Sequence, residues 1–220
     1  MLLQLLRNDP TISQFIDVSC SENGISINID ASIQADNLLI IKVDRFYNAL
    51  VASPKPSPDC LVILQCSDTS YKIFIVELKD INSPGHFTID NIVEKFTNCL
   101  GDFMSTRFGQ YFHSPDFHFE EIKLLFITDP YDFLGNPGKQ LRMRGHRLDA
   151  LMAQRIPRYF NKHLFIEHKV PNPTIRNCIL DHMQPHQLSG PHFPLLPIAI
   201  GAKACPVCIV RYSFFHTVRM

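Results

Sequence analysis

The sequence predicts an α/β domain built on a mixed β-sheet. Two apolar segments, residues 60–66 and 72–79, are joined by the polar turn at 67–70, a pattern typical of a β-hairpin. An amphipathic helix follows from Thr88, and residues 122–128 form another apolar strand. Because a helical crossover precedes it, that strand is expected to run parallel to 72–79, which makes the sheet mixed.

The first 50 residues carry shorter signals. A helical start is followed by a turn over 21–24 and by the alternating run 25–30, which predicts a strand. The apolar run 38–47 fits a helix or a strand, and its pattern does not choose between them. Prolines 54, 56 and 58 forbid a helix and lead the chain, extended, into the strand 60–66.

Side chains alternate along the return strand of the hairpin. One face carries Ile73, Ile75, Glu77 and Lys79, and the other carries Phe74, Val76 and Leu78. Both faces are mostly apolar, so we expect a buried central strand whose last residues turn polar. In the helix that follows, apolar residues repeat at helical spacing: Ile89, Ile92, Val93, Phe96, Cys99, Leu100 and Phe103.

The C-terminal third is less regular. A basic segment after Gly138 predicts a helix, and residues 163–167 predict a further strand. Seven prolines between 171 and 206 interrupt any regular element. We expect one α/β domain over 1–170 and a Pro-rich extension over 171–220 that packs on it.

Charge is distributed unevenly along a chain of 220 residues with zero formal net charge. Residues 1–138 carry nine Lys and Arg against eighteen Asp and Glu, whereas residues 139–169 carry eight against two. The basic segment is the candidate for DNA contact, a solvated helix face being the alternative. Its candidate nucleic-acid-binding residues are Lys139, Arg142, Arg144, Arg147, Arg155 and Arg158.

The sequence also bears on the cellular compartment and on whether the cysteines are reduced or disulfide-bonded. No run approaches the roughly 18 apolar residues of a membrane-spanning helix, and the N-terminus lacks the features of a signal peptide. The seven cysteines are odd in number, and Cys60, Cys66 and Cys99 lie within apolar patterns where a reduced thiol packs well. We therefore expect a cytoplasmic protein without a disulfide framework and without a membrane partner.

Three charged residues lie at one edge of the predicted hairpin. Asp59 precedes its first strand, and Glu77 and Lys79 end its second. Since adjacent strands lie about 4.8 Å apart, the two carboxylates can face each other across one ion. Lys79, about 6.6 Å further along the strand, can orient or polarise a water molecule. Mg²⁺ held by one or two carboxylates supplies the chemistry of phosphodiester hydrolysis.

These residues resemble the signature of the PD-(D/E)xK nuclease superfamily, which includes type II restriction endonucleases, Holliday junction resolvases and RecB-like nucleases. Pro58-Asp59 and Glu77-Leu78-Lys79 match its motif, and the resemblance extends over about residues 44–128. It implies a restriction-endonuclease-like core with a mixed central sheet flanked by helices. It also implies Mg²⁺, or Mn²⁺, bound by Asp59, Glu77 and the Leu78 carbonyl, with Lys79 acting at the attacking water.

The superfamily often places a further acid on an upstream helix, and Asp44 or Asp36 is the candidate here. The Gln-x-x-x-Tyr box of RecB-like members is absent, because the helix over 88–104 contains no Gln. This departure favours a resolvase-like or restriction-enzyme-like member.

A zinc site is the remaining metal candidate. Cys205 and Cys208 have the spacing of half a structural zinc site, and Cys178 and His182 are candidate partners. Two buried thiols near the C-terminus are the alternative.

The leading interpretation is a Mg²⁺-dependent DNA endonuclease of a restriction or mobile-element system, for which a homodimer would suit cutting of both strands. The first alternative is a catalytically inactive nucleic-acid-binding or interaction module on the same fold, because Pro-Asp followed by Glu-x-Lys also arises by chance. The second is a zinc-stapled adaptor.

Overall fold

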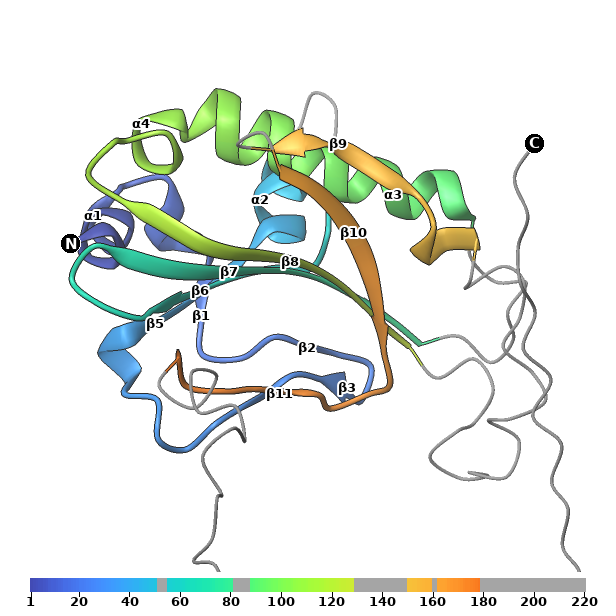
Figure 1. Ribbon diagram of the computed structural model, residues 1–220, viewed down its shortest axis with the longest axis horizontal. Helices are drawn as coiled ribbons and strands as arrows, with labels where there is room; N and C mark the ends of the chain where they lie inside the picture. Colours follow the sequence, from blue (N-terminus) through green and yellow to red (C-terminus); the bar gives the residue numbers. More distant parts are fainter. Residues whose placement is uncertain (51–54, 81–87, 129–149, 160–161, 179–220) are drawn as a thin grey trace, which may run out of the picture. The chain divides into compact units, whose positions relative to one another are not determined.

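The computed structural model describes residues 1–50, 55–80, 88–128, 150–159 and 162–178. Seven strands form one mixed sheet in the order β1-β5-β6-β7-β8-β10-β9 (Figure 1). They are β1 (Ile16–Asp17), β5 (Leu38–Lys42), β6 (Cys60–Gln65), β7 (Ser70–Lys79), β8 (His118–Thr128), β9 (Arg155–Tyr159) and β10 (Lys162–Lys169). The pairs β7–β8 and β8–β10 are parallel and the other pairs are antiparallel. The predicted α/β class with a mixed sheet is confirmed.

The β6–β7 hairpin is the centre of the sheet. Six residue pairs join the strands, from Cys60 opposite Val76 to Gln65 opposite Tyr71. The turn is closed by the Cys66 amide, which donates to the Ser70 carbonyl at 2.8 Å. Both strands are buried along nearly their whole length. The predicted hairpin, its buried return strand and the parallel strand β8 are therefore confirmed, as is the strand predicted over 163–167, which is β10.

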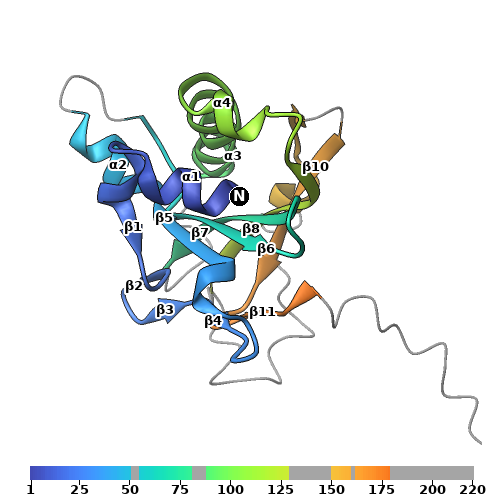
Figure 2. The same cartoon turned by 90° about the vertical axis from the view of Figure 1, so that its left-hand side faces the viewer.

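Helices cover one face of the sheet, here called the helical face (Figure 2). They are α1 (Leu2–Asn8), α2 (Val43–Ala49), α3 (Ile89–Asn98), the π-helix η4 (Cys99–Arg107) and α4 (Gly109–Phe112), with the 3₁₀ turn η1 (Ile12–Phe15). A second 3₁₀ turn, η2 (Ala35–Asn37), leads into β5. The helix predicted from Thr88 is confirmed, because its apolar positions lie buried or half-buried against the sheet. The ambiguous run 38–47 contains both elements, since β5 passes directly into α2.

Short strands cover the opposite face (Figure 1). β2 (Ser21–Glu22) pairs with β3 (Ile25–Ser26), and β4 (Asn28–Ile29) pairs in parallel with β11 (Thr174–Ile175). The strand predicted over 25–30 is thus divided between two small sheets. A second apolar core fills the space beneath them, with Val62, Phe74 and Leu125 contributed by the main sheet.

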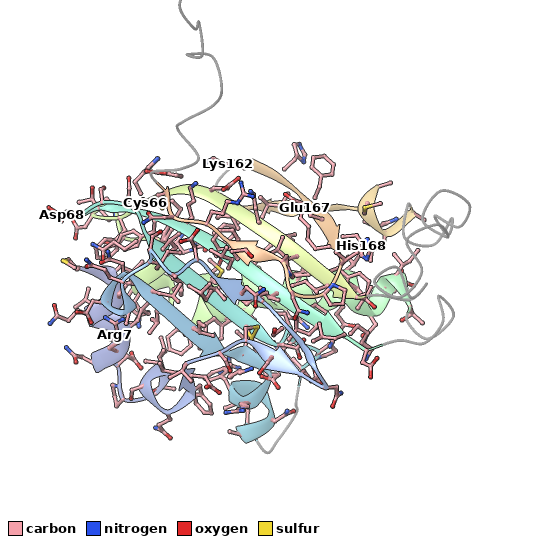
Figure 3. The ribbon with its side chains drawn as sticks, turned by 90° about the horizontal axis from the view of Figure 1, so that it is seen from below. Arg7, Cys66, Asp68, Lys162, Glu167 and His168 are labelled. Atoms are coloured by element: carbon pink, nitrogen blue, oxygen red, sulfur yellow. A yellow bond between two sulfur atoms is a disulfide. The ribbon has the colours of Figure 1, made fainter. Side chains whose placement is uncertain are left out.

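Two disulfides fasten this layer to the sheet. Cys20 is bonded to Cys60 at the start of β6, and Cys178 is bonded to Cys66 beside the hairpin turn (Figure 3). Cys99 is a free buried thiol, as expected. The prediction of no disulfide framework is wrong, because each cysteine in an apolar strand meets a distant partner from the covering layer. Cytoplasmic localisation stays a prediction and loses its cysteine argument, since cytosolic thiols are normally kept reduced.

The C-terminal expectations are only partly within the described residues. Residues 1–183 form one compact unit, so the boundary expected at 170 falls inside it, and the second unit, 184–220, lies outside the described residues. The helix predicted for the basic segment is wrong at its end, where Arg155–Tyr159 is the edge strand β9. Pro157 suits that position, because an edge strand does not need every N–H in the ladder.

Within the described part of the chain, no helix has the length and apolar character needed to cross a membrane.

We predict that removing the Cys66–Cys178 bond with the double variant Cys66→Ala/Cys178→Ala lowers the free energy of unfolding by about 2–4 kcal/mol. The bond spans 112 residues and therefore restricts the unfolded chain strongly. Urea denaturation without reductant measures the loss. As a control, dithiothreitol should destabilise the variant less than the wild type, because only Cys20–Cys60 remains to be reduced. Equal stability of the two proteins would contradict the pairing.

Candidate active site

Asp59 and Glu77 meet at one end of the β6–β7 hairpin. Asp59 immediately precedes β6, and the register that joins Cys60 to Val76 brings it opposite Glu77. The end of β5 borders the same point, because Lys42 pairs with Cys60. The two carboxylates that the sequence predicts to share an ion are therefore neighbours.

The Asp59 carboxylate is held inside the fold, where the residue is 8% exposed. Its Oδ2 accepts a hydrogen bond from the Leu78 amide at 2.5 Å, and its backbone carbonyl accepts one from the Val43 amide at 3.1 Å. Burial, and after it the negative charge of Glu77, raises the pKa of Asp59 to about 8, against the lowering effect of the Leu78 hydrogen bond. Ionisation of one acid therefore disfavours ionisation of the other in this buried site.

Glu77 is more deeply buried, at 1% exposure. Its Oε1 accepts a hydrogen bond from Lys95 Nζ at 2.6 Å, while Oε2 is buried without a hydrogen-bond partner in the described part of the chain. Burial raises the pKa of Glu77 to about 6, although the charges of Lys95 and Lys79 lower it. One ammonium contact therefore does not fully offset the loss of hydration.

Lys95 is one site residue that the sequence-based prediction missed. It lies on α3, three residues after Ile92 and four before Cys99, both of which face the sheet. Residues at these spacings share one side of a helix, so a lysine there is directed toward the core. A single cation among the apolar positions of the amphipathic pattern was the signal that could have identified it.

Lys79 ends β7, two residues beyond Glu77 and on the same side of the strand. It is half-buried, and its charge lowers the pKa of Glu77, although burial is the dominant influence and acts in the opposite direction. Its backbone is fixed by Thr128, whose Oγ1 donates to the Lys79 carbonyl at 2.6 Å. The predicted trio of Asp59, Glu77 and Lys79 therefore lies at one end of the β6–β7 hairpin.

Of the two candidate accessory acids, only Asp44 is near the trio. It lies in the first turn of α2, next to Val43, whose amide bonds the Asp59 carbonyl. Its Oδ1 is buried and has no hydrogen-bond partner within the described ranges, and burial raises its pKa. Asp36 is exposed and precedes the opposite end of β5.

Glu22 adds a fourth negative charge from the covering layer. It belongs to β2, which the Cys20–Cys60 bond fastens beside Asp59. Its charge contributes to the raised pKa values of Asp44, Asp59 and Glu77, in each case after burial. No local pattern could reveal this approach, because it depends on a disulfide between residues 40 positions apart.

The donor set fits a hard divalent cation. Mg²⁺ prefers oxygen ligands and is commonly held by one or two carboxylates, keeping several waters. Asp59 and Glu77 could supply the carboxylates, and the partnerless Oε2 with two raised pKa values indicates that Lys95 alone does not stabilise the ionised form of both acids. Among the residues described, no group of three or more His, Cys, Asp and Glu is arranged to hold a metal, so a dedicated protein cage is absent there.

The other predicted sites lie mostly outside the described residues. This holds for Lys139, Arg142, Arg144 and Arg147 and for the zinc candidates His182, Cys205 and Cys208. Arg155 and Arg158 belong to β9. Cys178 is not available as a zinc ligand, because its sulfur is bonded to Cys66.

No protein-family model matches the chain, and comparisons with curated proteins and with solved structures found no match. Function therefore has to be inferred from the residues of the site.

The raised pKa of Asp59 predicts that the protein loses stability as the pH rises. In the unfolded chain this carboxyl titrates near 3.8, and in the folded protein near 8. The contribution of Asp59 to the free energy of unfolding is fully present below its unfolded-state pKa and is lost as the pH rises through its folded-state pKa. Asp59→Asn should remove this loss and increase the unfolding free energy at pH 9 by on the order of 2–3 kcal/mol relative to the wild type.

Urea denaturation at pH 5, 7 and 9 without divalent cations measures the effect. The exposed carboxylate Asp116 provides the matched control, because Asp116→Asn should follow the wild type at every pH. The same pH dependence in wild type and Asp59→Asn would mean that the buried carboxyl titrates normally.

Proposed function

We propose that this chain is a metal-dependent endonuclease that hydrolyses phosphodiester bonds in DNA, with Asp59, Glu77 and Lys79 as its catalytic residues. The observation that carries the proposal is the joint burial of two carboxylates whose pKa values are both raised. Buried carboxylates without full neutralisation destabilise a fold, so stability alone does not account for them. Their position beside Lys79, at one end of two central strands, supports a catalytic role.

Each residue has a role in the proposed reaction. Asp59 and Glu77 would hold Mg²⁺ or Mn²⁺ together with the Leu78 carbonyl. The ion would neutralise charge on the scissile phosphate and make a bound water more acidic. Lys79 would orient the attacking water and contact the phosphate. Asp44, with its partnerless Oδ1, would be the accessory acid that accepts a hydrogen bond from water at the same edge.

The proposed substrate is DNA, and the basic segment 139–169 is the proposed contact to its phosphates. Eight Lys and Arg against two acids in 31 residues would offset the acidic remainder of the chain during approach to a polyanion. A homodimer would bring two sites to the two strands of a duplex.

The contact between Lys95 and Glu77 supports a second candidate function. If this ammonium is the permanent counter-ion of Glu77, the chain would be an inactive nucleic-acid-binding or interaction module on the same fold. Lys95 Nζ already lies 2.6 Å from Oε1, which is one of the oxygens that an ion would use. The two candidates differ in whether a divalent cation binds at all.

We predict that the purified protein nicks supercoiled plasmid in the presence of Mg²⁺ and that EDTA stops the reaction. Lys79→Ala should reduce the rate about 100-fold or more, the range expected for loss of a group that assists proton transfer. Lys55→Ala is the matched control, because it removes only a pair with Asp102 at a half-exposed ammonium. Nicking that survives Lys79→Ala unchanged would remove the proposed mechanism, and absence of nicking in wild type would favour the inactive module.

We also predict binding of Mg²⁺ that is independent of activity. At about ten times its Kd, the ion should raise the Tm of the wild type by about 3 °C or more and leave that of Glu77→Gln unchanged. Differential scanning calorimetry at pH 8 measures both. Na⁺ at equal ionic strength controls for screening. An equal shift in both proteins would show that the ion binds elsewhere.

A further inference from the structure

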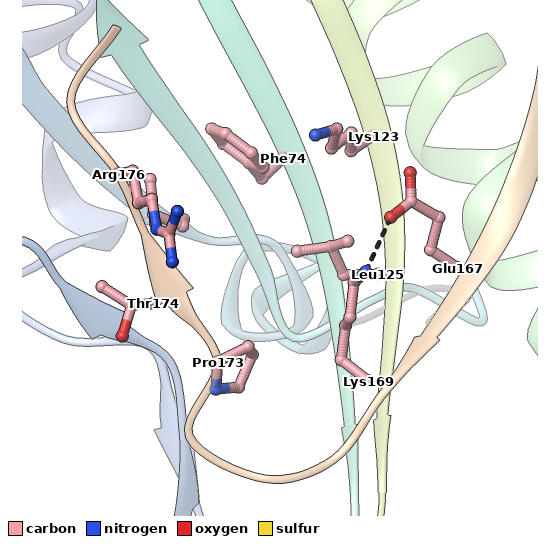
Figure 4. A pocket seen from close by; sticks show the side chains of 9 residues that line it. Phe74, Lys123, Leu125, Glu167, Lys169, Pro173, Thr174 and Arg176 are labelled. Atoms are coloured by element: carbon pink, nitrogen blue, oxygen red, sulfur yellow. Dashed lines mark ion pairs between the residues drawn. The ribbon is translucent and has the colours of Figure 1, made fainter. Parts of the chain in front are cut away.

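A cavity of about 430 Å³ lies on the sheet face opposite Asp59 and Glu77. It is bounded by β7, β8 and β10 of the main sheet and by the segment around β11 (Figure 4). This volume lies within the range of sites that hold small organic ligands. Phe74 at its floor alternates with Glu77 across β7, so the cavity and the candidate active site are on different sides of the strand.

The outer wall of the cavity, residues 173–176, is held in place by hydrogen bonds and by a disulfide. The Pro173 carbonyl accepts from the Asn28 amide at 2.9 Å, and the Ile175 carbonyl accepts from the Asp30 amide at 3.0 Å. Three residues beyond Ile175, the chain is bonded to the hairpin through Cys178 and Cys66. Hydrogen bonds on one side and a covalent link on the other hold this wall at a constant distance from the sheet.

The floor of the cavity is apolar and contains one aromatic ring. Phe74, Leu125 and Ile175 are buried in the second core and present their remaining surface to the cavity. Pro173 continues this surface along the wall. An aromatic ligand could stack on or meet the edge of Phe74 with its ring shielded from water.

The rim carries an excess of positive charge. Lys123, Lys169 and Arg176 line the cavity together with one carboxylate, Glu167. Lys169 pairs with Glu167 at 3.1 Å, and Lys123 pairs at 3.0 Å with Glu121, which is not among the lining residues.

Arg176 is exposed and makes no ion pair within the described residues. Arg176 and Lys123 lie on either side of Phe74 (Figure 4). The planar guanidinium of Arg176 matches the paired oxygens of a phosphate group, and the Lys123 ammonium adds to the positive charge around the cavity.

We propose that this cavity binds an aromatic phosphate monoester of the size of a nucleoside monophosphate. The ring lies on the Phe74 floor, and the phosphate accepts hydrogen bonds from Arg176 at one side of that floor, while Lys123 adds positive charge at the other side. A dianionic phosphate suits the rim better than a carboxylate, because it carries more negative charge and still offers two oxygens to the guanidinium fork. The site is independent of the proposed nuclease function, since it uses none of the residues of the carboxylate pair.

The test is an isothermal calorimetric titration of the full chain with AMP. The buffer contains EDTA, so that the candidate metal site does not contribute. Adenosine and inorganic phosphate, each at the same concentrations, are the partial ligands. AMP should bind at least tenfold more tightly than either of them. Arg176→Gln should weaken AMP binding about tenfold or more, because an exposed guanidinium makes the charge-assisted bonds. Arg176→Lys should weaken it less.

Two further variants locate the binding. Lys162→Gln removes a cation from the same strand as Lys169 but outside the cavity, and it should leave the affinity unchanged. Glu77→Gln should also bind AMP as the wild type does, whatever the outcome of the nuclease assays. Failure to bind AMP would overturn the proposal. Inorganic phosphate or adenosine binding as tightly as AMP would also overturn it. So would a loss of AMP binding in Glu77→Gln while Arg176→Gln binds AMP as the wild type does.

Discussion

The fixed register of β6 against β7 is the constraint on which the site depends. The turn closed by the Cys66 amide and the Ser70 carbonyl sets this register, and a slip by one residue would exchange the side chains packed in the two apolar cores on either face. The register therefore holds Asp59 opposite Glu77 whether or not the carboxylates favour the arrangement. Their burial in a medium of low polarity then raises both pKa values, and Lys95 meets only one of the four carboxylate oxygens.

Periodic features were predictable from the sequence, and contacts between distant segments were not. The hairpin, the helix from Thr88 and the parallel strand β8 follow from alternation, helical spacing and connection length. The run 38–47 resisted assignment, because apolar residues at consecutive positions satisfy both periods until Lys42, where β5 ends and α2 begins. Asp59, Glu77 and Lys79 were proposed because they lie at the ends of the predicted hairpin strands, and Asp44 was proposed from the resemblance to the nuclease superfamily.

The missed parts of the site and of the fold come from pairs that no local pattern encodes. Glu22 reaches the site through the Cys20–Cys60 bond, and β11 reaches the sheet through Cys66–Cys178. Cys60 and Cys66 look like ordinary core residues of an apolar strand, and nothing in the sequence around Cys20 or Cys178 indicates a partner. Lys95 is different, since its position among the apolar residues of α3 did carry a signal in the sequence.

The two faces of the sheet differ in chemistry. On the helical side, Asp59 lies opposite Glu77 and Lys95 pairs with Glu77, which is an arrangement suited to a cation. On the opposite side, an apolar floor is surrounded by cationic side chains, which is suited to an anion. Alternation along β7 separates the two, because neighbouring residues such as Phe74 and Ile75 point in opposite directions. One central strand can thus support two sites of opposite charge preference.

The central claim is that Asp59 and Glu77 form a buried carboxyl pair whose ionised form the protein alone stabilises incompletely. The most direct test is a ¹³C NMR titration of the side-chain carboxyl groups, assigned with Asp59→Asn and Glu77→Gln, in the absence and presence of Mg²⁺. The account predicts that Asp59 titrates far above 3.8 without the ion and that Mg²⁺ lowers its pKa. Titration of both groups near their ordinary values, unmoved by Mg²⁺, would contradict it.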